Sequence, residues 1–221
     1  PGVSMPRPEP SPTERPRRLV RLRIPLLLLG VALAAAACSS SVKLPPLPQD
    51  AVVLAFGDSL TFGTGAGPGE SYPARLEGLI GRRIVNAGVP GEISAEGLIR
   101  LPGYLDREKP ALLILCHGAN DILRRLDLQE TAANLRAMVR MAQERGVAVV
   151  LVGVPAFNLS LTPPPFYSEV AKEFGTAYEG TILPKVLAKG TLKSDYVHPN
   201  AAGYRRLAEA LDKLLRESGA I

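Results

Sequence analysis

Residues 51–60 read Ala-Val-Val-Leu-Ala-Phe-Gly-Asp-Ser-Leu, an apolar run that leads into glycine, aspartate and serine. Three further short, mainly apolar runs occur along the chain, and each is soon followed by glycine: residues 83–85, 111–116 and 147–152. Segments with the apolar spacing of helices lie between and after them: residues 72–80, 95–107, 128–145 and 201–217. Strands that are almost wholly apolar and alternate with helices predict an α/β fold, with a parallel sheet covered on both faces.

Polar or small residues follow three of the predicted strands. Ser59 comes after the first strand, Gly91 after the second and Asn120 after the third. Ligands in sheets of this kind bind at the carboxyl ends of the strands. We therefore expect these residues to meet at one edge of the sheet, and the loop at residues 194–200, before the last helix, can return to it.

The polar groups at this edge suggest a serine hydrolase. A serine hydroxyl is a weak nucleophile at neutral pH and needs a general base, which a third group must orient. The chain has two histidines. His117 ends the apolar run at 111–116, where a ring is expected to be packed, whereas His198 lies in a polar loop three residues after Asp195. We therefore predict Ser59 as nucleophile, His198 as base and Asp195 as its partner.

Composition indicates one globular domain and argues against two classes of site. The 221 residues are 46% hydrophobic and 21% charged, as in ordinary globular proteins. Six of the 26 basic residues but only two of the 21 acidic ones lie in residues 1–37, so the remainder is nearly neutral. Nucleic-acid binding needs a clustered basic surface, and we expect none. Cys116 and His117 are adjacent but nothing supplies further zinc ligands, so we expect no metal and no cofactor.

The N-terminal part resembles a sorting signal. Residues 1–37 run from a Pro- and Arg-rich stretch into an apolar segment of about a dozen residues, short of the roughly 20 that span a bilayer. Cys38 follows directly, as in a bacterial lipobox, although Ala35 stands where leucine is usual. Lipidation would make Cys38 the mature N-terminus and attach the protein to a membrane. Plain secretory cleavage near Ala37 and a short membrane anchor are the alternatives. We expect an exported bacterial protein, periplasmic or a membrane-anchored lipoprotein.

The rest of the chain is predicted to hold a linker and one domain. Residues 38–50 contain Cys38 and a proline-dense stretch that reads as an extended linker. The domain is expected to cover residues 51–221 and to be monomeric. If Cys38 is modified, Cys116 is left as a lone buried thiol, and no disulfide can form within the chain.

Four motifs in order resemble the GDSL or SGNH hydrolase family of esterases and lipases: Gly57-Asp58-Ser59-Leu60, Gly91, Gly118-Ala119-Asn120-Asp121 and Asp195-Tyr196-Val197-His198. The compact bacterial thioesterase, lysophospholipase and arylesterase branch is most similar, and the likeness runs from about Ala51 to the C-terminus. It implies a three-layer α/β/α sandwich with a central parallel sheet, a flavodoxin-like arrangement. The nucleophile lacks the G-x-S-x-G elbow of α/β-hydrolases.

The resemblance also implies the catalytic roles. Ser59 would form an acyl-enzyme, with His198 as proton carrier and Asp195 fixing its tautomer. The oxyanion hole would consist of the backbone N–H groups of Ser59 and Gly91 and the side-chain amide of Asn120. Glycine at position 91 is expected because the substrate approaches the backbone closely.

The substrate is expected to be a small acyl ester or thioester with a short to medium chain. Residues 156–159 and 162–167 follow the fourth predicted strand and are expected to line the acyl pocket. A carbohydrate O-deacetylase with the same triad, or a catalytically inactive exported binding lipoprotein, are the alternatives.

Several nearby residues have open roles. Gly63, Gly65, Gly67 and Gly69 predict a flexible loop that forms a mobile wall of the site. Asp121 either orients Asn120 or caps the following turn. Arg124 and Arg125 either meet an anionic head group or are solvated.

Overall fold

The computed structural model describes residues 2, 3, 5, 42–158 and 160–221. Apart from residues 2, 3 and 5, the predicted signal region at 1–37 lies outside the described residues, as does Cys38. Within the described part, no helix is both long and apolar enough to cross a membrane. The domain described below consists of residues 42–158 and 160–221 and is one compact unit.

Five parallel strands form the central sheet, in the order β2-β1-β3-β4-β5. Their bounds are β1 (Val52–Gly57), β2 (Arg83–Gly88), β3 (Leu112–Cys116), β4 (Ala148–Val152) and β5 (Ala177–Glu179). The first four match the predicted runs. Strand β5 was not predicted, because its three residues are too few to show a pattern of their own.

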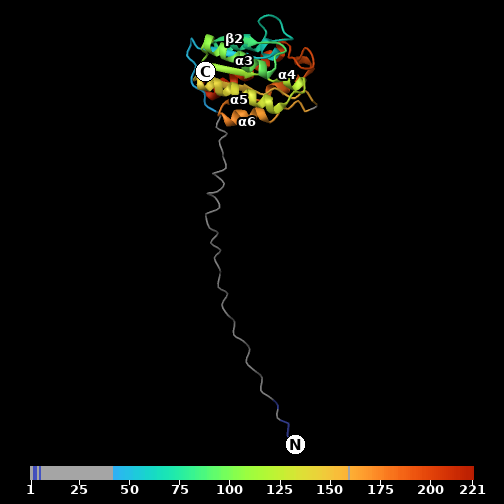
Figure 1. Cartoon of the computed structure of the whole chain (residues 1–221). Coiled ribbons are helices and arrows are strands. Elements are labelled where there is room, and N and C mark those ends of the chain that lie inside the picture. The colour runs from blue at the N-terminus through green and yellow to red at the C-terminus, as the bar shows by residue number, and fades with distance from the viewer. Residues whose placement is uncertain (1, 4, 6–41, 159) are drawn as a thin grey trace. The chain divides into compact units, whose positions relative to one another are not determined.

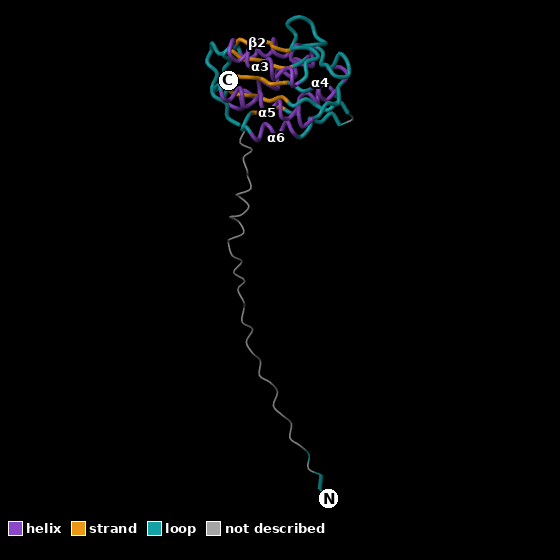
Figure 2. Tube along the Cα trace, viewed as in Figure 1, coloured by secondary structure: helices purple, strands orange, loops and turns teal. Residues whose placement is uncertain are grey.

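Helices cover both faces of the sheet and make three layers, as predicted. Their bounds are α1 (Ser59–Phe62), α2 (Tyr72–Ile80), α3 (Ser94–Glu108), α4 (Ala119–Leu123), α5 (Leu128–Glu144), α6 (Phe166–Glu173), α7 (Ile182–Leu187) and α8 (Ala201–Ser218), with a short 3₁₀ helix η2 (Gly190–Leu192). Helices α3 and α5 pack together across the near face in Figure 1, and Figure 2 shows the strands behind them. Helices α2 and α8 pack together on the other face.

The core lies on both sides of the central strands. Every residue of β3 is fully buried, and β1 is buried from Val53 onward. Strands enclosed on both faces gain from apolar side chains in both directions, which explains their continuous apolar sequence. The sandwich therefore holds its central strands rigidly and leaves the strand ends for polar groups.

The carboxyl ends of three strands are level with one another. Gly57, the last residue of β1, pairs in register with Gly88 of β2 and Cys116 of β3. A side chain at Gly57 would overlap the Cys116 carbonyl oxygen, so the strands approach this closely only with glycine there. Helices α1 and α4 begin within three residues of these ends. The register therefore brings the segments that follow the strands to one edge.

The segment before β1, predicted as an extended linker, packs on the domain. Leu44 and Leu47 are buried, and their backbone N–H groups donate to the carbonyls of Ser218 and Ala220, at 3.0 and 2.9 Å. Arg82, just before β2, donates to the Leu47 carbonyl at 3.2 Å. Leu44 and Leu47 thus pack against the domain that is predicted to cover residues 51–221.

Candidate active site

Three side chains form a hydrogen-bonded chain at the carboxyl edge of the sheet. Ser59 is the first residue of α1, and its Oγ lies 3.0 Å from Nε2 of His198. Nδ1 of the same ring lies 2.8 Å from Oδ2 of Asp195. The serine is 8% exposed, so its hydroxyl is at the surface of the fold but not free in solvent. The geometry makes Nε2 an acceptor for the serine proton when Nδ1 carries the ring hydrogen.

Asp195 holds its loop as well as the imidazole. Its Oδ1 accepts the backbone N–H groups of Val197 and His198, both at 2.8 Å. Partial burial raises the pKa of this carboxyl, but hydrogen bonds from the His198 ring and from these two N–H groups outweigh it, so the pKa lies below its usual value. The carboxylate therefore stays charged opposite the ring.

Asp58 joins the nucleophile's helix to the helix that carries Asn120. Its Oδ1 accepts the Leu60 N–H at 3.0 Å and caps α1, while Oδ2 accepts the N–H of Ala119 at 3.2 Å, at the start of α4. Asp58 is fully buried, and burial raises its pKa. The sequence marked this residue only as part of a motif. Its bonds fix Ser59 relative to α4.

Gly91 and Asn120 lie on two neighbouring segments joined by a hydrogen bond. Nδ2 of Asn120 donates to the carbonyl of Glu92 at 2.9 Å. An amide nitrogen carries two hydrogens, so the same group can also donate to an oxyanion. Gly91 has φ +82°, in the left-handed region that favours glycine. A Cβ at Gly91 would meet only Arg124 Nη2 within 4 Å, at 3.8 Å, so packing within the protein does not require glycine there, whereas the backbone conformation does.

The roles of Arg124 and Asp121 were left open by the sequence, and the structure gives both residues contacts within the protein. Nη2 of Arg124 donates to the Gly91 carbonyl at 2.7 Å, which ties α4 to the loop after β2. Asp121 is buried and its Oδ2 accepts the N–H of Ser94 at 2.9 Å, so it caps α3. Neither expected role of Asp121 describes this bond, because its partner lies 27 residues earlier in the chain.

The predicted acyl wall is partly wrong. Phe166 and Tyr167 begin α6 and are buried in the core. The Tyr167 hydroxyl donates to the His117 carbonyl at 2.7 Å, behind the end of β3. Apolar residues after a strand can face either a ligand or the protein interior, and here they face the interior.

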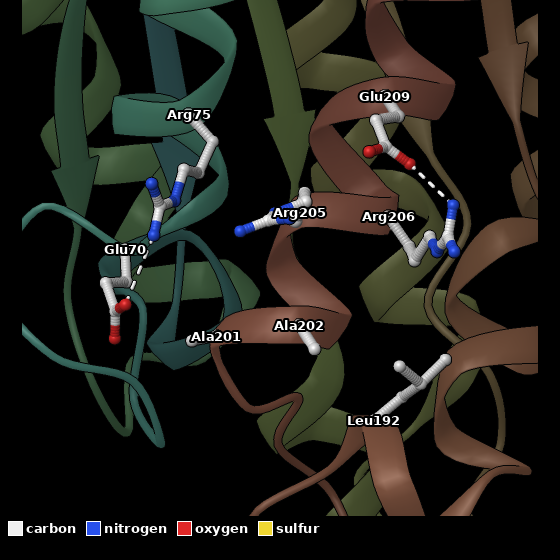
Figure 3. A pocket seen from close by; sticks show the side chains of 8 residues that line it. All are labelled: Glu70, Arg75, Leu192, Ala201, Ala202, Arg205, Arg206 and Glu209. Carbon is white, nitrogen blue, oxygen red and sulfur yellow. Dashed lines mark hydrogen bonds and ion pairs between the residues drawn. The ribbon is translucent and has the colours of Figure 1, made fainter.

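The glycine-rich loop after α1 is anchored at two points. The Tyr204 hydroxyl donates to the Thr64 carbonyl at 2.8 Å, and Glu70 accepts the Gly67 N–H at 3.0 Å. A groove of about 380 Å³ lies beyond this loop, between α2 and α8. Figure 3 shows Arg205 pointing toward Arg75 within it. Its described lining is Glu70, Arg75, Leu192, Ala201, Ala202, Arg205, Arg206 and Glu209, which includes none of the hydrogen-bonded chain. The groove is thus a neighbour of the site, not a part of it.

The described residues at this edge provide neither a metal site nor a reactive thiol. Among the described residues no group of His, Cys, Asp and Glu could hold a metal ion. Cys116 is a free, buried thiol whose pKa is raised well above its usual value by burial. A thiol in this state is unreactive.

Residues 55–206 match the sequence profile of the GDSL-like lipase/acylhydrolase family. The chain belongs to this family. The match contains Ser59, Gly91, Asn120 and the Asp195–His198 loop, so all four motifs fall inside the GDSL-like region. The protein is a hydrolase that acts on ester bonds, and the resemblance drawn from the sequence is confirmed.

Relatives of known structure and name agree with the family. Esterase TesA of Pseudomonas aeruginosa is 29% identical over 189 residues, which cover 78% of this chain and 91% of the relative. Thioesterase 1/protease 1/lysophospholipase L1 of Escherichia coli K12 is 28% identical over 174 residues, 74% of this chain and 83% of the relative. The crystal structure of AlinE4, an SGNH-hydrolase family esterase, is 33% identical with a TM-score of 0.60, covering 77% of this chain and 97% of that one.

Proposed function

We propose that this GDSL-family protein cleaves short to medium acyl esters and thioesters through an acyl-enzyme on Ser59. The observation that carries the proposal is the continuous hydrogen-bonded chain from Ser59 Oγ through His198 to Asp195, at 3.0 and 2.8 Å. Such a chain activates a hydroxyl that is otherwise a poor nucleophile.

The first half of the reaction transfers the acyl group. Ser59 Oγ attacks the carbonyl carbon while Nε2 of His198 takes the hydroxyl proton, and charge moves onto the carbonyl oxygen. The N–H groups of Ser59, Gly91 and Asn120 donate to that oxyanion. The intermediate then collapses: the bond to the leaving oxygen or sulfur breaks, and the proton on His198 passes to the alcohol or thiol.

The second half releases the acid. A water molecule attacks the acyl-enzyme, His198 takes its proton, and the same donors bind the second oxyanion. Collapse breaks the bond to Ser59 Oγ, which regains its proton from His198. Asp195 remains a carboxylate throughout and stabilises the imidazolium in each half.

Apolar side chains at the same edge favour an acyl substrate. Phe62, Val89 and Leu123 follow the first three strands and are all exposed, the first at 55%. Tyr196 is 89% exposed beside Asp195, where a cavity of about 390 Å³ lies. Exposed apolar side chains around a polar centre can accept a hydrocarbon chain while the carbonyl reaches the serine.

The sequence before the domain leads us to propose export as well. Residues 1–37 would direct the chain across a membrane, and Cys38 would then carry a lipid. The alternative is secretory cleavage near Ala37, which leaves no lipid.

Hydrolysis of p-nitrophenyl esters from acetate to palmitate tests the function, with the purified full chain and the Ser59→Ala variant. Ser168→Ala is the matched control, since this exposed hydroxyl donates to the carbonyl of Pro165, the N-cap of its own helix α6. We expect activity in the wild type and the control, a loss of at least about 10³-fold in Ser59→Ala, and a maximum at short or medium chains. Activity on acetate alone would favour sugar-ester deacetylation. A wild type inactive on every ester and thioester would refute the proposal.

A further inference from the structure

Behind Gly91 lies a buried cluster of ionisable side chains that the proposed mechanism does not use. Glu92 is 6% exposed, and its two carboxylate oxygens accept Nε and Nη2 of Arg100 at 2.7 and 2.6 Å. Nε2 of His117, a fully buried ring, lies 3.0 Å from the same carboxylate. Three hydrogen bonds, two from Arg100 and one from the His117 ring, therefore hold the Glu92 carboxylate.

The hydrogen bonds of His117 determine which ring nitrogen carries a hydrogen. Its Nδ1 accepts the N–H of Gly118 at 2.9 Å, so that nitrogen carries no hydrogen. Nε2 must then carry the hydrogen of a neutral ring and donate it to Glu92. The negative charge of the Glu92 carboxylate is then balanced by the positive charge of the Arg100 guanidinium. Burial raises the pKa of Glu92, but hydrogen bonds from His117 and Arg100 outweigh it and lower the pKa to about 2. The Glu92 side chain is therefore a charged carboxylate at neutral pH.

The cluster is joined directly to the groups proposed as oxyanion donors. The Glu92 backbone follows Gly91, and its carbonyl accepts the Asn120 amide at 2.9 Å. Arg100 also donates to the carbonyl of Ala87 at 3.0 Å, near the end of β2. The side chain of Glu92 is thus fixed to the sheet, while its backbone meets both Gly91 and Asn120.

Burial of these charges is costly, which argues for a role beyond packing. Apolar side chains of similar volume generally stabilise a core as well as an ion pair does, or better. Room for the cluster has also been made in α3, because a side chain at Gly97 would overlap the His117 ring. His117 was expected only to be packed. Its hydrogen bond to Glu92 supplies a reason for a histidine at this position.

We propose that Glu92, held by Arg100 and His117, is a positioning residue that aligns the Gly91 N–H and the Asn120 amide on the oxyanion. The inference rests on the proposed esterase function. Glu92 touches no reacting atom. A displaced donor weakens the transition state more than the bound substrate, because the charge on the oxygen develops only in the transition state.

Glu92→Gln tests this proposal, with Glu173→Gln as matched control. Glu173 also accepts from an arginine, Arg136, at 2.7 Å, but on the surface between α5 and α6. We expect kcat to fall about 10- to 100-fold in Glu92→Gln, less than for outright loss of a donor, with KM changed by less than about threefold. The control should match the wild type.

Thionoester substrates provide a measurement, the ester-to-thionoester ratio of kcat/KM, that a simple loss of protein stability would not change. Sulfur accepts hydrogen bonds weakly, so an intact oxyanion hole favours an ester over its thionoester. The ester-to-thionoester ratio of kcat/KM should fall in Glu92→Gln. A second pair covers the case in which that variant does not fold: His117→Leu should lower the ratio, and His117→Gln, whose amide can still donate to Glu92, should restore part of it.

Unchanged kcat and an unchanged ratio in the folded variants would overturn the positioning role, even if their melting temperatures fall. Absence of Ser59-dependent hydrolysis in the wild type would instead refute the esterase proposal itself. The two failures are therefore distinguishable.

Discussion

Replacement of Asp195 by asparagine should separate the loop function of this residue from its effect on the imidazole. The asparagine Oδ1 can still accept the two backbone N–H groups of Val197 and His198, each now at 2.8 Å. At the other position an NH₂ group replaces the Oδ2 that accepts Nδ1–H at 2.8 Å. Two donors cannot face each other, so the ring hydrogen must move to Nε2. That nitrogen can then no longer accept the proton of Ser59.

The expected loss of kcat in Asp195→Asn can be estimated from these hydrogen bonds. A hydrogen bond to a charged group contributes about 1.5–3 kcal/mol, and the wrong tautomer adds a cost of similar size to reach the productive state. The sum, about 3–6 kcal/mol, corresponds to a fall of roughly 10²- to 10⁴-fold in kcat. The free energy of unfolding should change by less than about 1 kcal/mol, because both backbone bonds remain.

Steady-state hydrolysis of a p-nitrophenyl ester and urea unfolding measure the two quantities. Asp127→Asn is the matched control: Asp127 accepts the Gln129 N–H at 2.7 Å as the cap of α5 and has no catalytic neighbour. We expect the control to keep wild-type kcat. If Asp195→Asn retained kcat within about threefold of the wild type while remaining folded, the tautomer argument would be refuted.

Three further changes have distinct expected outcomes. Gly97→Ala forces a Cβ into the His117 ring and should lower the free energy of unfolding by about 1–3 kcal/mol in urea titrations; an unaffected midpoint would contradict the close packing. Because the folded pKa of Glu92 is about 2, below the usual 4.5, its ionisation stabilises the fold above pH 4.5. The difference in free energy of unfolding between the wild type and Glu92→Gln should shrink as the pH falls from 4.5 through about 2. A difference that stays constant over that range would contradict a lowered pKa of Glu92. Cys38→Ser should abolish incorporation of labelled palmitate in bacteria that express the full chain, whereas persistent labelling would place any lipid elsewhere.

The sequence predicted the fold well where the signal is local and repeated. Four strands are continuous apolar runs, and α5 and α8 show clear helical spacing. Strand β5 and helices α1 and α4 have only three, four and five residues, so each covers little more than one helical turn or one repeat of a strand, which is too short to show a periodic pattern. They form because the level strand ends and tertiary contacts hold them.

The same contrast applies to the site. Asp195 and His198 are three residues apart, so one turn of the loop can bring them together, and the strand-end rule placed Ser59 and Asn120 at a common edge. The supporting bonds join distant segments. Arg124 reaches back 33 residues to Gly91, and Asp121 reaches 27 residues to Ser94. No local pattern encodes such partners, so Arg124 was interpreted as a head-group ligand or a solvated side chain, and Asp121 as a partner of Asn120 or a local cap.

The docking of Leu44 and Leu47 determines how the enzyme can be mounted on a surface. Both residues lie beside the end of α8, whose other end follows the His198 loop. An α-helix rises 1.5 Å per residue, so the 18 residues of α8 separate these two places by about 27 Å. The described domain therefore begins on the side away from the nucleophile, so a protein or resin fused directly ahead of Val42 would be joined there. Immobilisation through the N-terminal side should leave the mouth of the site turned outward and turnover of a dissolved ester unhindered.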